Sequence, residues 1–172
     1  MKHVVGVFLL LGMLAGCASQ PVLETVTDEI SQGAVAQPKQ ILVDIPGEAA
    51  LPAMDSNVGR MYLCEDYEIY IQTLSSGDIQ GTIQSISGYP AEELTVMQTQ
   101  KDGIRRYEFV WACAGETGDR LGRGVVLDDG SYHYVLTCMM DASRTQSLQP
   151  VVDELFDSFR LVSAEIDLNT GS

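Results

Sequence analysis

Asp128, Ser131 and His133 are of the three types that form a hydrolytic triad, and they lie close together in the sequence. In such a triad, a histidine takes the proton of the serine hydroxyl while a carboxylate orients the ring. Any chemistry that needs a histidine depends on His133, because the only other one, His3, lies in the leading segment. Ser131 and His133, however, are two residues apart on one predicted strand, about 6 to 7 Å between Cα atoms, without the strained turn that presents a nucleophile. We therefore keep a hydrolase as the alternative function.

The polar end of one predicted sheet face is the candidate binding site. Strand pairing, derived below, gathers four polar side chains at this end: Gln98, Arg105, Tyr107 and His133. In that register His133 lies beside Val126 on a neighbouring strand. Such side chains can hold a ligand by hydrogen bonds and charge. The alternative is a solvated sheet margin, where the nitrogens of His133 bond to neighbours or water.

Four cysteines occur, of which Cys17 belongs to the leading segment. The other three, Cys64, Cys113 and Cys138, cannot all pair with one another, and no C-x-x-C spacing typical of zinc ligands is present. In the derived register Cys113 and Cys138 lie on opposite faces about 9 to 10 Å apart, beyond the disulfide limit of about 7 Å. Each lies in an apolar run, where burial raises the pKa of a thiol. We expect buried thiols.

Acidic residues gather in two predicted hairpin loops, Glu116 with Asp119 and Asp128 with Asp129. Carboxylates can bind hard cations such as calcium. These loops lie at opposite ends of one strand, residues 120–128, so a shared cation site is not expected. The sequence also lacks a glycine-rich phosphate loop. We therefore predict neither a metal ion nor a cofactor.

The leading residues have the pattern of an export signal. A positive start, Met1-Lys2-His3, precedes an apolar stretch over 4–14 that is shorter than the roughly 20 residues of a membrane-spanning helix. A buried core helix is disfavoured, since Lys2 and His3 flank only one end. The stretch ends in a tetrapeptide that resembles the lipobox of bacterial lipoproteins, Leu14-Ala15-Gly16-Cys17. This resemblance implies a signal peptide over 1–16, cleavage before Cys17 and a diacylglycerol on the Cys17 sulfur.

The chain is strongly acidic, with 10 Lys and Arg against 24 Asp and Glu and a formal net charge of −14. This charge repels phosphate backbones and anionic lipid headgroups alike. We therefore expect no nucleic-acid partner, and attachment to the membrane through lipid on Cys17. The expected location is the bacterial cell envelope, anchored on the extracytoplasmic side.

Residues 17–57 are predicted to form a lipidated tether. Four of the six prolines fall in it, with Gly, Ala, Gln and Ser between them, a composition typical of limited structure. Residues 39–45 indicate a strand that ends at Pro46-Gly47.

A globular body is predicted over 58–162, followed by a C-terminal tail over 163–172. Strands are expected over 60–65 and 67–74, and then a short helix that begins after a capping box at 75–78 and ends at Gly88. Apolar runs joined by glycine-bearing turns then indicate an antiparallel meander of four strands, over 94–100, 104–113, 120–128 and 131–139. Residues 147–160 keep the 3.6-residue period of an amphipathic helix.

Two-residue Asp-Gly loops fix the register of hairpins. The predicted pairs at these loops are Lys101 with Ile104 and Asp128 with Ser131. For the middle hairpin we assume that Ala114 pairs with Asp119. One face then carries Met97, Val110, Ala112, Val125, Leu127, Tyr134, Leu136 and Cys138. The other carries Leu94, Val96, Phe109, Trp111, Cys113, Val126, Val135 and Met139. A sheet that is apolar on both faces must be covered on both, so we expect an α+β fold with an antiparallel sheet between helices, an α/β/α sandwich.

Three segments carry a family resemblance: Arg106 to Trp111, Tyr132 to Thr137, and Val151 to Arg160. Together with the early strand pair and the short helix, they resemble the Mog1/PsbP-like family over roughly 58–162. The resemblance implies that family's α/β/α sandwich and a non-catalytic binding role, and it supplies no catalytic residue.

The function we predict is a lipid-anchored extracytoplasmic lipoprotein that acts as a non-catalytic binding module. Its partner would be a protein or a small molecule of the cell envelope. The alternative is a cell-envelope hydrolase that uses the polar sheet end around His133.

Overall fold

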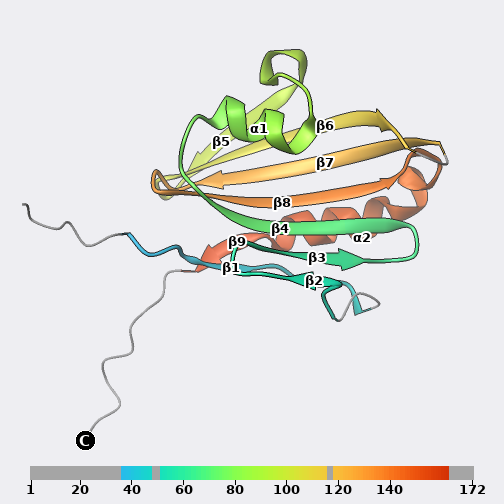
Figure 1. Cartoon of the computed structure of the whole chain (residues 1–172), viewed down its shortest axis with the longest axis horizontal. Coiled ribbons are helices and arrows are strands. Elements are labelled where there is room, and N and C mark those ends of the chain that lie inside the picture. The colour runs from blue at the N-terminus through green and yellow to red at the C-terminus, as the bar shows by residue number, and fades with distance from the viewer. Residues whose placement is uncertain (1–35, 48–50, 116–117, 163–172) are drawn as a thin grey trace, which may run out of the picture. The chain divides into compact units, whose positions relative to one another are not determined.

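In a computed structural model, the residues described, 36–47, 51–115 and 118–162, form a seven-stranded sheet, a two-stranded sheet and two α-helices (Figure 1). The predicted signal peptide, Cys17, the first part of the tether and the C-terminal tail lie outside the described residues. Within the described ranges, none of the helices has the length and apolar character needed to cross a membrane.

The main sheet has the strand order β2-β3-β4-β8-β7-β6-β5, and all its neighbouring strands are antiparallel. Its strands are β2 (Met54–Asp55), β3 (Gly59–Leu63), β4 (Tyr67–Ser75), β5 (Val96–Lys101), β6 (Ile104–Ala114), β7 (Asp119–Asp128) and β8 (Tyr132–Asp141). The two-stranded sheet pairs β1 (Gln40–Leu42) with β9 (Arg160–Val162). The helices are α1 (Ile79–Ser87) and α2 (Thr145–Ser158), with single 3₁₀ turns at η2 (Ala91–Glu93) and η3 (Ala142–Arg144). The predicted antiparallel meander is confirmed as β5 to β8.

The predicted hairpin register is confirmed at one Asp-Gly loop and wrong at the other. Lys101 pairs with Ile104 as predicted, and Ala114 pairs with Asp119 as assumed for the middle hairpin. Asp128, however, pairs with His133 and not with Ser131. The reason is the backbone: Asp102 and Gly103 both have positive φ, as a type I′ turn requires, whereas Gly130 alone does so in the β7–β8 loop.

The shift of two residues leaves every side chain on its predicted face, because the side-chain period of a strand is two. Val125 and Leu127 of β7 and Tyr134, Leu136 and Cys138 of β8 pack into one buried cluster, which includes Leu155 and Phe156 of α2. Val126 and Val135 pack into a separate cluster with Phe109, Trp111 and Ile83 of α1. Alternate residues of β7 and β8 therefore serve two cores, one for each helix.

Local signals explain the boundaries of α1. The carboxylate of Asp78 accepts hydrogen bonds from the backbone N–H groups of Gln80 (3.2 Å) and Gly81 (3.3 Å), which satisfies donors that a helix start leaves free. Gly88, with φ of 80°, ends the helix and donates its N–H to the carbonyl of Gln84.

The C-terminal helix ends earlier than expected. Residues 147–160 were expected to be helical, but α2 ends at Ser158 and Phe159 is extended. Arg160–Val162 instead pairs with Gln40–Leu42, which lies within the strand expected over 39–45 of the tether. Ile41, Val43 and Ile45 then pack against the cluster that contains α2. Residues 160–162 thus form a strand, despite the helical period of their sequence, because they pair with a strand more than a hundred residues away.

Candidate functional site

The structure places the four predicted site residues at the same end of the sheet, in two neighbouring rows. Gln98 pairs with Tyr107, and Tyr107 pairs with Val126. His133 lies in the next row, where it pairs with Asp128, which in turn pairs with Arg105. Their accessibility differs: Gln98 and Arg105 are exposed, whereas Tyr107 is 7% and His133 0% exposed.

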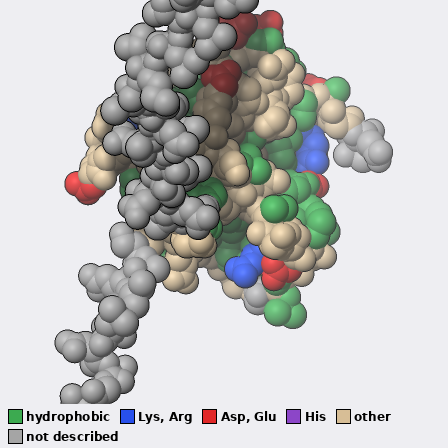
Figure 2. Space-filling model, turned by 60° about the vertical axis from the view of Figure 1, so that its left-hand side comes forward, with side chains coloured by type: hydrophobic (Ala, Val, Ile, Leu, Met, Phe, Trp, Pro, Cys, Tyr) green, Lys and Arg blue, Asp and Glu red, His purple; other side chains and the backbone are tan. Residues whose placement is uncertain are grey.

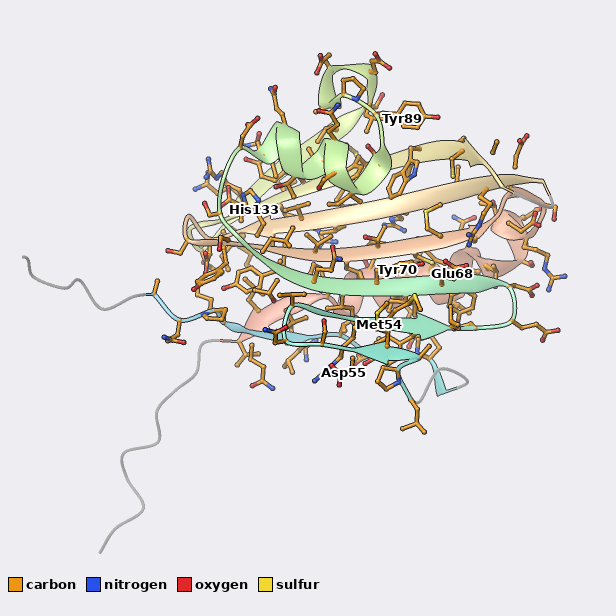
Figure 3. The ribbon with its side chains drawn as sticks, in the orientation of Figure 1. Met54, Asp55, Glu68, Tyr70, Tyr89 and His133 are labelled. Atoms are coloured by element: carbon orange, nitrogen blue, oxygen red, sulfur yellow. The ribbon has the colours of Figure 1, made fainter. Side chains whose placement is uncertain are left out.

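His133 is held inside the protein by its neighbours. Its Nδ1 shares a hydrogen bond with the hydroxyl of Thr82 in α1 (2.8 Å), and its Nε2 lies 3.8 Å from Oδ2 of Asp128. Nε2 has no hydrogen-bond partner within the described part of the chain. Figure 3 labels the residue near one end of β8, and its side chain is 0% exposed. Figure 2 shows the molecule from the side on which this end comes forward. His133 is therefore not at a solvated margin.

Asp128 connects this buried ring to the surface. Its Oδ2 forms an ion pair with Nη2 of Arg105 (2.7 Å), and its Oδ1 accepts the backbone N–H of Gly130 (2.7 Å). The carboxylate is 4% exposed, while the side chain of Arg105 is 46% exposed. One oxygen of Asp128 thus binds Arg105 and the other binds the backbone of the β7–β8 turn. This arrangement stabilises the end of the sheet.

Of the three cysteines in the described ranges, Cys138 is buried as expected, whereas Cys64 and Cys113 are half-buried. Cys138 is fully buried, and burial raises the pKa of its thiol to about 12, so it is inert at neutral pH. Cys113 is half-buried on the opposite face, as expected from the register.

A groove of about 350 Å³ lies between α2 and strands β5 to β7. Its lining includes two large apolar side chains that are more than half exposed, Met97 at 62% and Val110 at 54%. The remaining lining residues are Thr95, Glu108, Phe109, Leu121, Arg123, Met140, Thr145, Gln149, Val152 and Asp153. The sequence assigned Met97 and Val110 to a face expected to be covered, so reasoning from the pattern missed this groove.

Arg123 neutralises the charges of the groove. Its Nη1 contacts Oδ1 of Asp153 (2.7 Å), its Nη2 lies 3.6 Å from Oε2 of Glu108, and its guanidinium stands 4.5 Å from the ring centroid of Phe156. Arg106 forms a further ion pair with Glu108. Two arginines and two carboxylates therefore balance one another beside an apolar floor.

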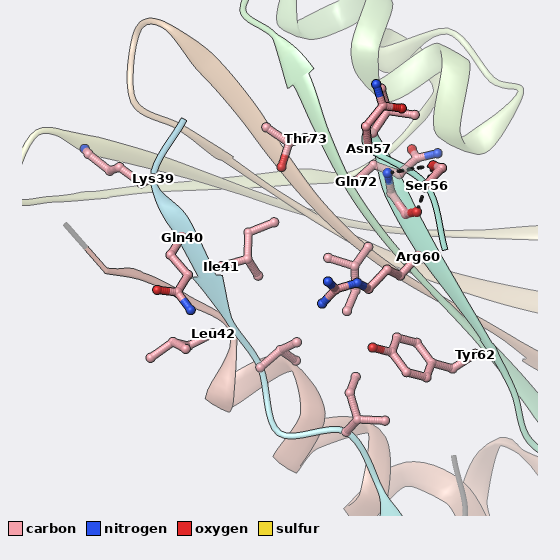
Figure 4. A pocket seen from close by; sticks show the side chains of 15 residues that line it. Lys39, Gln40, Ile41, Leu42, Ser56, Asn57, Arg60, Tyr62, Gln72 and Thr73 are labelled. Atoms are coloured by element: carbon pink, nitrogen blue, oxygen red, sulfur yellow. Dashed lines mark hydrogen bonds between the residues drawn. The ribbon is translucent and has the colours of Figure 1, made fainter. Parts of the chain in front are cut away.

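A second hollow, of about 380 Å³, lies between the β1 segment and strands β3 and β4 (Figure 4). Ile41 and Tyr62 contribute apolar surface to it, and the polar side chains of Gln40 and Gln72 also line it. Ser56 bonds to the backbone of Gly59 at its rim. The β1 segment itself is held by its pairing with β9 and by the packing of Ile41 against the cluster that contains α2.

The chain matches no family model and none of the curated proteins. It is similar to solved structures at low sequence identity. One is cyanobacterial PsbP from Synechocystis sp. PCC 6803, with TM-score 0.47, 13% identity, and coverage of 70% of this chain and 81% of that one. Another is the Ran-binding protein Mog1p of Saccharomyces cerevisiae, with TM-score 0.44, 11% identity, and coverage of 72% and 90%. A third is a Pseudomonas aeruginosa protein of unknown function, PA94, with TM-score 0.46, 11% identity, and coverage of 76% and 89%.

Proposed function

We propose that this protein is a non-catalytic binding module, anchored by lipid on Cys17 to the extracytoplasmic side of a bacterial envelope membrane. Its partner is a protein that docks in the groove between α2 and β5 to β7. The observation that carries this proposal is the exposure of Met97 and Val110 at the wall of that groove.

The physical argument rests on apolar area and balanced charge. Burying apolar surface releases about 25 cal/mol per Å², and Met97 and Val110 still have more than half of theirs to bury. The ion pairs of Arg123 leave no unpaired charge for a partner to desolvate. An apolar strip with a polar rim is typical of protein interfaces.

The lipid anchor follows from the sequence pattern and the charge. Removal of residues 1–16 deletes one lysine, so the mature charge is 9 − 24 = −15. A body with this charge is repelled by anionic headgroups. Two acyl chains on Cys17 bind the bilayer at about 0.8 kcal/mol per buried methylene and are sufficient without any electrostatic attraction.

We also infer three layers, with α1 and α2 on opposite sides of the main sheet. Support comes from the strand alternation: Val126 packs with the α1 cluster, while Val125 and Leu127 pack with the α2 cluster. Figure 1 is consistent with this arrangement.

The hydrolase alternative is disfavoured by the burial of His133. A general base must come within hydrogen-bond distance of its substrate, and a ring that is 0% exposed beneath α1 cannot do so without movement of the helix. The exposed Gln98 and Arg105 remain proposed ligand contacts at that end.

Site-specific photo-crosslinking from the groove in intact cells tests the docking surface. Val110→Asp places a charge on the apolar wall and should reduce the crosslinked partner at least tenfold, with little change in the melt. Val58→Asp is the matched control, because Val58 is equally exposed (55%) and lies outside the groove. Equal capture by the two variants would refute the docking site.

Cys17→Ser tests the anchor separately. The variant should lose palmitate labelling and leave the membrane fraction, because no other attraction to lipid remains. Unchanged membrane partition would contradict the lipoprotein assignment and leave the groove proposal standing.

A further inference from the structure

The two outer edges of the main sheet differ in how well they are protected. An edge strand presents unpaired N–H and C=O groups to which another chain can add a strand, so proteins shorten, bend or cover such edges. At one edge, β2 has only two residues and begins just after Pro52. At the other edge, β5 has six residues without a proline, and its one charge is on Lys101 at the end of the strand (Figure 1). β5 is therefore the open edge of the sheet.

Hydrogen bonds of β6 show which of its residues bond towards β5. Successive residues of a strand direct their N–H and C=O groups alternately to its two sides. Gly115, just beyond β6, donates its N–H to the carbonyl of Gly118 (2.8 Å) in continuation of the β6–β7 register, so odd-numbered residues of β6 bond to β7. The carbonyl of Ala112 accordingly faces away from β7, and beyond the end of β5 it accepts the Tyr89 hydroxyl (2.8 Å). Even-numbered residues of β6 therefore bond to β5.

The same alternation identifies the free backbone groups of β5. The residues opposite the even-numbered positions of β6 are Met97, Thr99 and Lys101. The Asp102-Gly103 turn agrees with this assignment, because the pair that closes a two-residue type I′ loop is hydrogen-bonded. The residues that direct N–H and C=O outward are Val96, Gln98 and Gln100. Within the described ranges β5 pairs with β6 alone, so these three residues form an open row of donors and acceptors.

A second copy of β5, running antiparallel, matches this row. With Gln98 opposite Gln98 of the second copy, Val96 of each copy lies opposite Gln100 of the other. All three outward residues are then paired, and each of the three pairs can exchange two N–H···O bonds. A shift of this register by two residues would leave one outward residue of each strand opposite a residue outside β5. The strand is therefore complementary to itself in one register.

The charges at the two ends of β5 favour the same arrangement. Lys101 ends the strand, whereas Glu92 and Glu93 of η2 precede it, and none of the three has an ion-pair partner within the described ranges. Antiparallel pairing places Lys101 opposite Thr95 of the second copy, next to that acidic turn, whereas parallel pairing would place two lysines together. β5 itself has no acidic residue, although the chain has 24, so the seam avoids close repulsion between two acidic bodies.

We propose that two copies of this chain pair through β5, with a two-fold axis at Gln98, and join their seven-stranded sheets into one continuous sheet. Side chains directly opposite each other share one face of a sheet, so the docking grooves that contain Met97 open on the same side in both copies. The pairing goes beyond the proposed function, because it uses backbone groups of the edge and needs no partner in the groove.

A cysteine at the two-fold axis tests the register in intact cells. Gln98→Cys places two Cα atoms about 5.5 Å apart across the seam, within the range of a disulfide. Gln100→Cys is the matched control, because Gln100 is also exposed and lies on the same face, but about 14 Å from its counterpart in the second copy. Oxidation by copper phenanthroline should crosslink Gln98→Cys at least about fivefold more than Gln100→Cys, and the unmodified chain gives the background from its native cysteines. Equal crosslinking of the two variants would overturn the proposal.

A proline at the same position tests the backbone bonds. Gln98→Pro removes an outward N–H, which an edge strand tolerates, whereas Gln98→Ala keeps it. Sedimentation equilibrium of the purified full-length protein in detergent should show a dimer that dissociates about tenfold more readily in Gln98→Pro and about equally in Gln98→Ala. If Gln98→Pro lowers the melt, the cysteine pair decides.

Three results of these experiments would overturn the pairing. The first is an unmodified chain that stays monomeric up to about 100 μM. The second is an equal dissociation constant for the folded proline and alanine variants. The third is a crosslink from residue 98 to a different protein in place of a second copy, which would assign the edge to another partner. None of the three bears on the Val110→Asp test of the groove, so the two proposals fail separately.

Discussion

Replacing Gly122 by alanine tests the packing of Trp111 against β7. The added Cβ would lie 2.2, 2.3 and 2.7 Å from Cε2, Cζ2 and Cδ2 of the indole, whereas carbon atoms in contact are normally about 3.5 to 4.0 Å apart. Trp111 is 5% exposed and stacks on Phe109 with ring centroids 5.5 Å apart. The indole therefore has to move by about 1 Å or more in a packed cluster.

The expected effect is a net destabilisation of about 1 to 2 kcal/mol. Overpacking a core costs about 1 to 3 kcal/mol, and the clash with three ring atoms favours the upper part of that range. Replacing a glycine in a strand by alanine stabilises the folded state by about 0.5 to 1 kcal/mol, because it lowers the conformational entropy of the unfolded chain. For a body of this size, the difference lowers Tm by roughly 4 to 8 °C.

Thermal melts and tryptophan emission together check this prediction. Emission should shift to longer wavelength in Gly122→Ala, as the displaced indole gains contact with water. Gly77→Ala is the control, because its Cβ meets nothing within 4 Å and its φ is not positive; it should change stability by about 0.5 kcal/mol or less, or raise it. An unchanged Tm and emission maximum in Gly122→Ala would refute the contact between the glycine and the ring.

Three further predictions follow from buried groups. Phe156→Ala should lower the free energy of unfolding by about 3 to 5 kcal/mol, because the ring is 0% exposed and the Arg123 guanidinium stacks on it. A decrease in Tm of only a degree or two would contradict this. Thr82→Val should cost about 1 to 3 kcal/mol, because it leaves both ring nitrogens of His133 without a partner, and a neutral result would contradict the burial of the imidazole. Burial alone would raise the pKa of Asp129, but hydrogen bonds from the backbone and Tyr134 lower it. Its contribution to stability is therefore present above the ordinary carboxyl pKa of about 3.9 and lost as the pH falls through the lower folded value. Denaturant unfolding should therefore show that the free energy of unfolding falls less between pH 7 and pH 3 in Asp129→Asn than in the unmodified protein. An equal fall in both proteins would contradict the lowered pKa of Asp129.

Local chemistry made most of the sheet predictable, and its limits show at the two Asp-Gly loops. At 102–103 the dipeptide forms the expected two-residue turn. In the β7–β8 loop, Asp129 accepts hydrogen bonds from the backbone of Ser131 and Tyr132, and its carboxylate also meets Lys39 at 3.4 Å. The lysine comes from a segment ninety residues earlier, so no window around the loop could have indicated this ion pair.

The candidate sites were harder to predict than the strands. His133 was recognised as an unusual residue of a polar sheet end, but its burial depends on Thr82 and α1 above it. Met97 and Val110 have the same pattern of apolar alternation as Val125 and Leu127, yet only the latter pair is covered. Alternation indicates that a face is apolar, and it carries no information about which strands a helix covers.

The position of the proposed docking groove follows from the width of the sheet. Seven strands about 4.8 Å apart span roughly 29 Å, whereas one helix with its side chains is about 10 to 12 Å wide. Each of the two buried clusters contains one α-helix, and the β1–β9 pair lies beside only one of them. A strip of sheet therefore remains uncovered in the α2 layer, at β5 and β6, and another remains beside α1, at β4 and β8. The first strip is apolar with balanced ion pairs and suits a protein surface.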